Sequence, residues 1–363
     1  MLLNFLLSII VSFFISFIIT PLVKNFFIKK AWVEDIVAKQ KKTHNVTSLV
    51  PIPRGGGIPI FIAVALTTLF FLTIDKHLVG ILLAAFFALV IGLWDDIKDI
   101  SPRFRLLTNI ITALIVIFSG IGISFLSNPF GGIIDLSHFQ INFTFFGSHS
   151  IWIFSDLLAL VWIVSCMNIV GWSAGIEGQL PGFVSISAIF ISVLALKHSA
   201  DITQWPVIIL AGAITGAYLG FLPFNFFPQK IQPGYSGKSL AGFFLAILAI
   251  LSGAKLATVI FLLGVPILDA VFTIIRRILN KKSLLLSDGQ HLHHQLLKLG
   301  WSRKKIAITY WFFSLLLGSI TLFLNSRQKF YVFIGLSLIF FFFLTQIYQH
   351  TSPKPNRSHR HQV

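Results

Sequence analysis

Long apolar runs, broken by short clusters of polar and charged residues, dominate this chain. A hydrocarbon core about 30 Å thick needs about 20 apolar residues per spanning helix. Apolar windows between Gly, Pro and charged breaks approach this length at eleven places, so we expect an all-α polytopic membrane protein with ten or eleven spans. The predicted spans are 4–23, 57–74, 79–94, 106–126, 151–170, 182–196, 205–222, 239–253, 256–275, 305–324 and 330–348.

The composition excludes an ordinary soluble domain. Hydrophobic residues make up 56% of the chain and charged residues only 11%, against roughly 25% charged in soluble proteins. No internal repeat or separate soluble segment is visible. We therefore predict one integral membrane domain over residues 1–350, followed by a basic, disordered cytoplasmic tail over 351–363.

Basic residues predict the orientation of the spans. Loops on one side of the eleven-span ladder, together with the tail, hold 23 of the 28 Lys and Arg residues. Cytoplasmic loops carry the excess of Lys and Arg, so this side is predicted to be cytoplasmic and the N-terminus outside. The net charge of +16 then favours anionic lipid headgroups and anionic substrates as partners. Nucleic acid is not expected, because the basic residues are spread over six segments.

The unusual polar residues all fall on the predicted cytoplasmic side. A transporter would more often place ionisable residues and broken helices near the bilayer midplane, whereas the middles of these spans are almost purely apolar. We therefore disfavour a transporter and expect an active site where the membrane meets the cytosol. The polar segments are "PIPRGGG" with Arg54, "DDIKD" with Asp95, Asp96 and Asp99, "NIVGWSAGIEG" with Asn168 and Glu177, "GYSGK" with Lys238, and "SDGQHLHH" with Asp288, His291, His293 and His294.

These segments indicate phosphate chemistry only when they are taken together. Adjacent aspartates at a helix end can turn toward one cation, and Mg²⁺ takes one or two carboxylates plus phosphate oxygens. Glycine-rich turns such as "PRGGG" and "GYSGK" let backbone N–H groups approach an anion. Singly, each has a plainer interpretation: a solvated helix cap, an ordinary turn, or, for "HLHH", the start of an interfacial helix, which we favour over a zinc site. The set favours a phosphorylated soluble donor, Mg²⁺ (with Mn²⁺ as a substitute) and a lipid acceptor.

In their order along the chain, the motifs resemble the polyprenyl-phosphate N-acetylhexosamine-1-phosphate transferases. That family includes translocase I of peptidoglycan synthesis and the UDP-GlcNAc:undecaprenyl-phosphate GlcNAc-1-phosphate transferases. The resemblance covers roughly residues 20–300, and the spacing of the histidines is nearer the GlcNAc-1-phosphate branch. The segments that carry it are "PIPRGGGIPIF", "GLWDDIKDISPRFRLL", "GFLPFNFFPQKI", "VPILDA", the Arg276-Arg277 pair and "DGQHLHH".

The resemblance implies a bacterial plasma-membrane enzyme that moves GlcNAc-1-phosphate from UDP-GlcNAc to undecaprenyl phosphate, releasing UMP. Such a step would begin a cell-wall, peptidoglycan or lipopolysaccharide-type glycan. Homodimerisation stays open. The implied catalytic residues are Asp95 and Asp96, which with Glu177 are the implied Mg²⁺ ligands. Residues implied to contact substrate are Arg54, Asn168, Glu177, Asn225, Lys238, Asp288, His291, His293 and His294.

Some positions depart from the family pattern. Gly171 replaces an asparagine, Ala174 and Tyr235 replace aspartates, and Arg105 replaces a lysine. Lys238, where serine is usual, is a hypothetical substitute for part of the metal charge. Two alternatives therefore stay open beside the main interpretation: transfer of phospho-MurNAc-pentapeptide, as in translocase I, and an impaired relative that binds lipid phosphate or nucleotide sugar without transfer.

Overall fold

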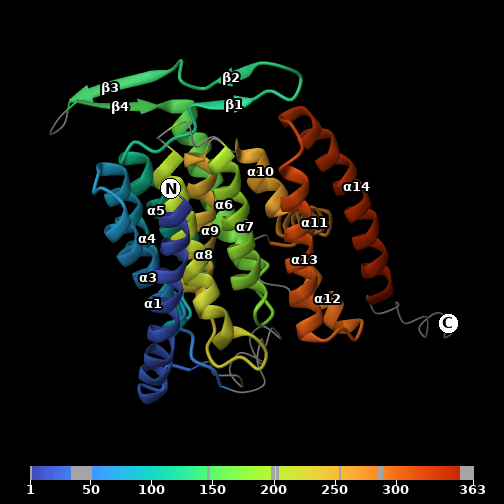
Figure 1. The fold of residues 1–363 in the computed structure, drawn as a ribbon. Coiled ribbons are helices and arrows are strands. Elements are labelled where there is room, and N and C mark those ends of the chain that lie inside the picture. The colour runs from blue at the N-terminus through green and yellow to red at the C-terminus, as the bar shows by residue number, and fades with distance from the viewer. Residues whose placement is uncertain are drawn as a thin grey trace, which may run out of the picture.

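The computed structural model describes residues 2–33, 51–144, 148–197, 201, 204–252, 255–283 and 289–351. Most of these residues form helices that lie side by side, with a small β layer across one end (Figure 1). The elements are α1 Leu2–Lys29, α3 Gly57–Phe71, α4 Lys76–Lys98, α5 Pro102–Phe118, β1 Phe125–Ser127, β2 Ile133–Asp135, β3 Gln140–Thr144, β4 Ser148–Trp152, α6 Ile153–Trp172, α7 Gln179–Lys197, α8 Trp205–Asn225, α9 Gly234–Leu251, α10 Lys255–Leu262, α11 Gly264–Leu279, α12 Leu292–Lys298, α13 Arg303–Thr321 and α14 Ser326–Thr351.

The helices confirm an all-α polytopic membrane protein. Each of the eleven predicted spans coincides with a helix, or, for 256–275, with the pair α10 and α11, which is bent by 83°. Within the described residues, seven single helices are long and apolar enough to cross a membrane. The count of spans rises to eight if the bent pair α10 and α11 is one span. These seven are α1, α4, α6, α7, α8, α9 and α14. Spans at α3, α5 and α13 therefore stay a prediction.

The segment after α5 differs from expectation. The predicted span 106–126 extends too far, because α5 ends at Phe118 and Gly120 follows with a left-handed backbone (φ 93°). Residues beyond that turn form two antiparallel hairpins, β1 with β2 and β3 with β4. Phe125 pairs with Asp135 in the first hairpin, and Gln140 pairs with Trp152 in the second. The hydrophobic residues of β1 lengthened the apolar run, so the helix boundary was not visible in the sequence.

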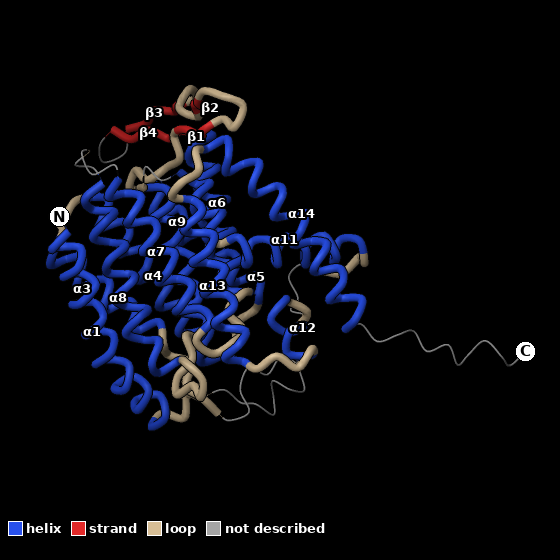
Figure 2. Tube along the Cα trace, turned by 45° about the vertical axis from the view of Figure 1, so that its right-hand side comes forward, coloured by secondary structure: helices blue, strands red, loops and turns tan. Residues whose placement is uncertain are grey.

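The two ends of the helix bundle differ in character. The hairpins and the start of α1 lie at one end, and α12 and the end of α14 lie at the other (Figures 1 and 2). Gly80, near the start of α4, packs against Ser119, the residue just after α5, so closely that a Cβ on Gly80 would clash with the Ser119 side chain. This contact is at the hairpin end. Helix α4 therefore starts near the hairpins and delivers Asp95 and Asp96 to the opposite end. Which end faces the cytosol stays a prediction.

Small residues allow α1 and α8 to pack closely. Ser8, Ser12, Ser16 and Thr20, spaced by four along α1, are fully buried, and Ser12 Oγ donates a hydrogen bond to the Ala213 carbonyl at 2.6 Å. Glycines 212, 216 and 220 lie on the facing side of α8, where added Cβ atoms would clash with α1. Small residues at this spacing are typical of close helix pairs in membranes.

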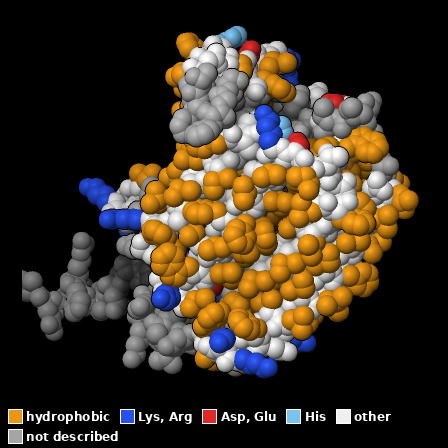
Figure 3. Space-filling model, turned by 90° about the vertical axis from the view of Figure 1, so that its left-hand side faces the viewer, with side chains coloured by type: hydrophobic (Ala, Val, Ile, Leu, Met, Phe, Trp, Pro, Cys, Tyr) orange, Lys and Arg blue, Asp and Glu red, His pale blue; other side chains and the backbone are white. Residues whose placement is uncertain are grey.

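Helix α9 lies in the middle of the bundle and packs against α3, α4, α6, α7, α8 and α10. Its first turn is therefore surrounded by protein at the end where α4 stops. The outer helices instead present apolar side chains: Figure 3 shows them covering most of one face, with Lys and Arg side chains around its rim. This distribution matches a protein whose flanks contact lipid and whose ends contact water.

Candidate active site

Helix α4 ends in a fully buried carboxylate, Asp95. Its Oδ1 accepts hydrogen bonds from Arg105 Nε at 2.6 Å and from the Ile100 backbone N–H at 3.1 Å. The N–H of Asp99 still bonds the Asp95 carbonyl at 2.8 Å, and the left-handed backbone of Asp99 (φ 47°) then ends the helix. The other carboxylate oxygen, Asp95 Oδ2, is buried without a hydrogen-bond partner among the described residues. Leaving such an oxygen without a donor is costly, so it is a candidate contact for a bound ligand.

The neighbouring carboxylate, Asp96, binds the first turn of α9. Its Oδ1 accepts from the Tyr235 backbone N–H at 2.6 Å, and its Oδ2 accepts from Ser236 Oγ at 2.6 Å and Ser236 N–H at 3.3 Å. Gly234 makes this approach possible: its φ is 67°, and a Cβ there would lie within 2.5 Å of Asp96 Cγ. We expected the "GYSGK" turn to offer these N–H groups to a substrate anion. The anion that Tyr235 and Ser236 bind is instead the protein's own Asp96.

Arg54, the arginine of the "PRGGG" turn, points toward the aspartates at the end of α4. Its Nη1 is 3.1 Å from Asp99 Oδ1, and its Nε is 3.8 Å from Asp96 Oδ1. The glycines of this turn serve close packing: Gly56 N–H donates to the Gln232 carbonyl at 3.1 Å, and a Cβ on Gly56 would lie 2.7 Å from that oxygen. The turn therefore joins α3 to the segment before α9 and brings Arg54 close to Asp96 and Asp99; its predicted contact with substrate stays a prediction.

A second cluster is built around the predicted histidines. Asp269, buried in α11, accepts from the Leu292 backbone N–H at 2.8 Å and lies 3.0 Å from His291 Nδ1. The His291 ring stacks on Trp172, with centroids 6.2 Å apart, and lies nearly parallel to His293 at 6.0 Å. Asp269 thus fixes the start of α12 and the orientation of the first histidine.

His293 is the buried member of this cluster. Burial, followed by the nearby His294, His291 and Lys238, holds the pKa of His293 well below its usual value. Its ring occupies space left by Gly175, where a Cβ would lie within 2.5 Å of the His293 ring. His293 is therefore a neutral imidazole at pH 7, and Lys238 lies close enough to affect its charge.

Glu177 and Asn225 secure the loop between α6 and α7. Glu177 Oε1 accepts from Arg303 Nη1 at 2.5 Å, and its Oε2 is buried without a partner in the described part of the chain. Asn225 Oδ1 accepts from Gly178 N–H, and its Nδ2 donates to the Ile231 carbonyl, both at 3.0 Å. Both residues thus have fixed protein partners in this structure.

The remaining predicted site residues are Asn168 and Asp288. Asn168, in the last turns of α6, donates from Nδ2 to the Val164 carbonyl of its own helix at 2.7 Å. Asp288 lies outside the described residues. The first turns of α9 join the two clusters, since Tyr235 and Ser236 bind Asp96 while Lys238 lies close to His293.

The three predicted metal ligands are not gathered into one protein cage. Among the described residues, no group of three or more His, Cys, Asp or Glu side chains is arranged to hold a metal ion. Asp96 is held by α9 and one oxygen of Glu177 by Arg303, whereas Asp95 Oδ2 and Glu177 Oε2 have no hydrogen-bond donor in the described part of the chain. Mg²⁺ commonly takes only one or two carboxylates and completes its shell with substrate phosphates and water. The residues therefore fit a metal ion that Asp95 would hold together with a bound substrate.

Several residues of these clusters were not among the predicted site residues. Tyr235, Arg105 and Ser236 contact the acid pair, and Asp269 and Trp172 hold the histidines. Arg105 and Tyr235 had been noted only as departures from a family pattern. Asp269, a lone acid in an apolar run, carried a usable signal, because an unpaired buried carboxylate is rare.

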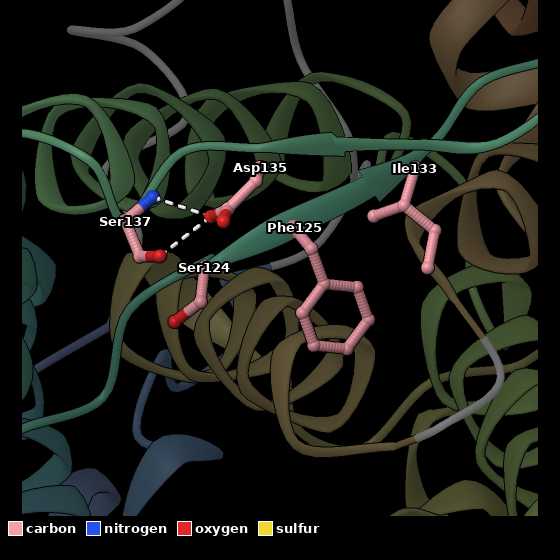
Figure 4. Close-up of a pocket in the computed structure, with 5 residues that line it drawn as sticks. All are labelled: Ser124, Phe125, Ile133, Asp135 and Ser137. Atoms are coloured by element: carbon pink, nitrogen blue, oxygen red, sulfur yellow. Dashed lines mark hydrogen bonds between the residues drawn. The ribbon is translucent and has the colours of Figure 1, made fainter.

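The hairpin end holds a separate, open cavity of about 440 Å³. Figure 4 shows its lining, in which Asp135 accepts hydrogen bonds from the backbone and hydroxyl of Ser137. Phe125 and Ile133 from the paired strands β1 and β2 also line it. None of the predicted site residues lines this cavity, so it does not belong to either cluster.

Comparison with known proteins identifies the family. The sequence model of glycosyl transferase family 4 matches residues 78–253, from α4 with the acid pair through α9. A phospho-N-acetylmuramoyl-pentapeptide-transferase of Bacillus cytotoxicus is 30% identical over 326 residues, covering 87% of this chain and 96% of that protein. The chain belongs to glycosyl transferase family 4. It is thus a member of a family of transferases, as its motifs predicted.

Two relatives with other names are similar over comparable lengths. A probable undecaprenyl-phosphate N-acetylglucosaminyl 1-phosphate transferase of Bacillus subtilis is 29% identical over 346 residues, covering 92% of this chain and 89% of that protein. A decaprenyl-phosphate N-acetylglucosaminephosphotransferase of Mycobacterium leprae is 28% identical over 328 residues, covering 80% of this chain and 78% of that protein. The similarity extends beyond the family model to the histidine cluster.

Proposed function

We propose that this chain transfers GlcNAc-1-phosphate from UDP-GlcNAc to a polyprenyl phosphate, releasing UMP. Two relatives named for this kind of transfer are similar to this chain over most of its length. The site adds support from chemistry, because it brings carboxylates, guanidinium groups and histidines to one end of a bundle of apolar helices. Such a position suits a reaction between a lipid in the membrane and a charged donor in water.

The placement of the acid pair carries the proposal. Along α4, a row of exposed apolar side chains at helical spacing includes Leu83, Phe86, Val90, Trp94 and Ile97, and it runs to the end of the helix where Asp95 lies on the buried face. A prenyl chain lying along this row would bring its phosphate to the polar end of the helix. At that end of the helix lies Asp95 Oδ2, a buried carboxylate oxygen without a hydrogen-bond donor among the residues that the structure describes.

In the proposed reaction, an oxygen of the lipid phosphate attacks the β-phosphorus of the UDP-sugar. A new P–O bond forms, and the bond from the β-phosphorus to the bridging oxygen breaks, so that oxygen leaves with UMP. A phosphomonoester has its second pKa near 6, so the attacking group is already largely ionised near pH 7. Asp95 Oδ2 can accept the proton that remains on the minor monoprotonated form.

Positioning and charge neutralisation dominate such transfers. Arg54 and Arg105 would neutralise phosphoryl oxygens, and Lys238 and the histidine cluster would contact the nucleotide sugar. Asp96 would fix the first turn of α9 beside the reacting groups. Mg²⁺, held by Asp95 when bound, would supply further neutralisation of diphosphate charge.

Transfer of phospho-MurNAc-pentapeptide is the second candidate. A specific observation favours it: the 30% identical relative carries that name and is covered almost completely. The spacing of the histidines favours the GlcNAc donor instead. For either donor we infer a bacterial plasma membrane, with the acid pair on the cytosolic side, since nucleotide sugars are cytosolic.

The test uses the full chain in lipid nanodiscs with undecaprenyl phosphate and, in separate reactions, radiolabelled UDP-GlcNAc, UDP-GalNAc and UDP-MurNAc-pentapeptide. Label extracted into the organic phase only with UDP-GlcNAc is the expected result. Asp75→Asn is the matched control for Asp95→Asn, because Asp75 caps the opposite end of α4 and asparagine caps equally well. Label with the muropeptide donor alone would support the second candidate, and no label with any donor would favour a binding protein without transfer.

A further inference from the structure

Tyr235 contacts both halves of the acid pair in different ways. Its backbone N–H donates to Asp96 Oδ1 at 2.6 Å, which any residue except proline can do. Its ring lies under the guanidinium of Arg105, whose Cζ is 5.0 Å from the ring centroid. Arg105 Nε in turn donates to Asp95 Oδ1 at 2.6 Å. The side chain of Tyr235 therefore reaches Asp95 through Arg105.

Two contacts fix the Tyr235 ring against α5. The hydroxyl donates to Asn109 Oδ1 at 3.1 Å, while the ring face supports Arg105. Arg105 and Asn109 are four residues apart, so they lie on the same face of α5, one turn from each other. The ring is held at its tip and at its face, and Arg105 cannot change rotamer freely while the ring occupies this place.

The position of Arg105 determines which oxygen of Asp95 is left for a ligand. Arg105 and the Ile100 N–H both bind Oδ1, and Oδ2 has no partner in the described part of the chain. The Arg105 side chain is 30% exposed, and its Nη2 is 3.7 Å from Asp99 Oδ1, too far for a hydrogen bond. Among the described residues, the Arg105 side chain donates a hydrogen bond from Nε and none from its terminal nitrogens. The terminal N–H groups can therefore donate to a phosphate oxygen.

We propose that Tyr235 is a positioning residue that holds Arg105 against Asp95, so that Asp95 Oδ2 and the terminal N–H groups of Arg105 face the same substrate phosphate. This inference rests on the proposed function for the identity of the phosphate, and on the contacts above for the positioning itself. It gives the aromatic residue at 235 a role of its own, although the family pattern has an aspartate there. A planar guanidinium suits this role because it stacks on an aromatic face and binds phosphate through two parallel N–H groups.

The first experiment measures the fixation of Arg105 without any substrate. The full chain in nanodiscs is treated with phenylglyoxal, and labelling of Arg105 is compared by mass spectrometry with that of the exposed Arg103 on the same helix. Tyr235→Leu removes the ring face and is expected to raise the Arg105/Arg103 labelling ratio by about 2- to 30-fold, the range of a cation–π contact. Tyr235→Phe keeps the face and is expected to change the ratio by less than about twofold. An unchanged ratio in Tyr235→Leu would overturn the positioning role.

The second experiment measures transfer kinetics for single and double variants. Tyr235→Leu and Arg105→Lys are each expected to lower kcat/KM by about 10- to 100-fold, as loss of a group that orients an active-site ligand does. Because Tyr235 acts through Arg105, the double variant should be no more than about threefold worse than the poorer single variant. Tyr331→Leu, on the exposed face of α14, is the matched control and should behave as wild type. Fully additive losses would overturn the proposal.

A third variant separates positioning from a lost carboxylate. If residue 235 only lacked the acid of the family pattern, Tyr235→Asp would raise activity; the positioning role predicts a fall similar to that of Tyr235→Leu, and a gain would overturn it. Failure of the proposed function is distinguishable from failure of this inference. A wild-type chain that transfers nothing would contradict the function, and the labelling ratio would still decide the role of Tyr235.

Discussion

Replacing Gly234 with alanine tests the contact between α4 and α9 most severely. The left-handed backbone at Gly234 (φ 67°) costs a residue with a Cβ about 1–2 kcal/mol. The added Cβ would also lie within 2.5 Å of Asp96 Cγ, whereas carbon atoms in ordinary contact are about 3.5–4.0 Å apart. The carboxylate would have to move by about 1 Å.

Such a shift would break the short hydrogen bonds that Asp96 accepts from Tyr235 and Ser236. Hydrogen bonds to charged groups contribute about 1.5–3 kcal/mol each, so losing one or two of them weakens the site by about 3 kcal/mol. At about 1.4 kcal/mol per factor of ten, we expect kcat/KM for lipid phosphate to fall by about 100-fold in Gly234→Ala. The assay is transfer of label from the donor that the wild-type chain uses.

Gly132→Ala is the control for backbone strain. Gly132 has φ 80° in the β1–β2 hairpin, and nothing lies within 4 Å of an added Cβ. It carries the left-handed cost without the clash, far from the acid pair. The refuting result is a Gly234→Ala variant that is folded and keeps activity within about threefold of wild type. It would show that the contact of Asp96 with α9 does not matter for function.

Three further predictions concern stability, measured as thermal midpoints in detergent. Gly216→Ala should destabilise by about 2 kcal/mol or more, because a Cβ would lie 2.8 Å from the Phe13 nitrogen and closer still to the Ile9 carbonyl; an unchanged midpoint would contradict the close α1–α8 contact. Arg303→Leu should cost up to about 3 kcal/mol by leaving buried Glu177 unpaired, and Arg303→Lys should recover part of it. The pKa of His293 lies below that of an exposed histidine, about 6.5. Stability from this residue is therefore present above pH 6.5 and is progressively lost as the pH falls below 6.5, a loss that His293→Phe should remove.

The acid pair shows what the sequence can predict. Two aspartates at the end of an apolar run are costly unless something binds them, so their position alone indicated a site. In the structure Asp95 is buried at the last turn of α4, and its role in a site stays a prediction. The helix spans were predictable for the same reason, because bilayer thickness fixes their length.

The partners of these residues were not predictable. Asp96 binds N–H groups more than 130 residues away in the chain, and this pairing depends on how α4 and α9 pack. The "GYSGK" turn was predicted to bind a substrate anion, because the sequence of a glycine-rich turn does not indicate whether its N–H groups bind a substrate or a carboxylate of the protein. The same limit applies to Glu177 with Arg303 and to His291 with Asp269.

The central claim is transfer of a sugar together with its phosphate, which the position of one phosphorus label tests directly. Wild-type chain in nanodiscs is given undecaprenyl phosphate and UDP-GlcNAc labelled with ³²P at the β-phosphorus. The account predicts that the label enters the lipid, that UMP is released unlabelled, and that Asp95→Asn abolishes both. Label retained in released UDP while the sugar alone moves to the lipid would contradict it.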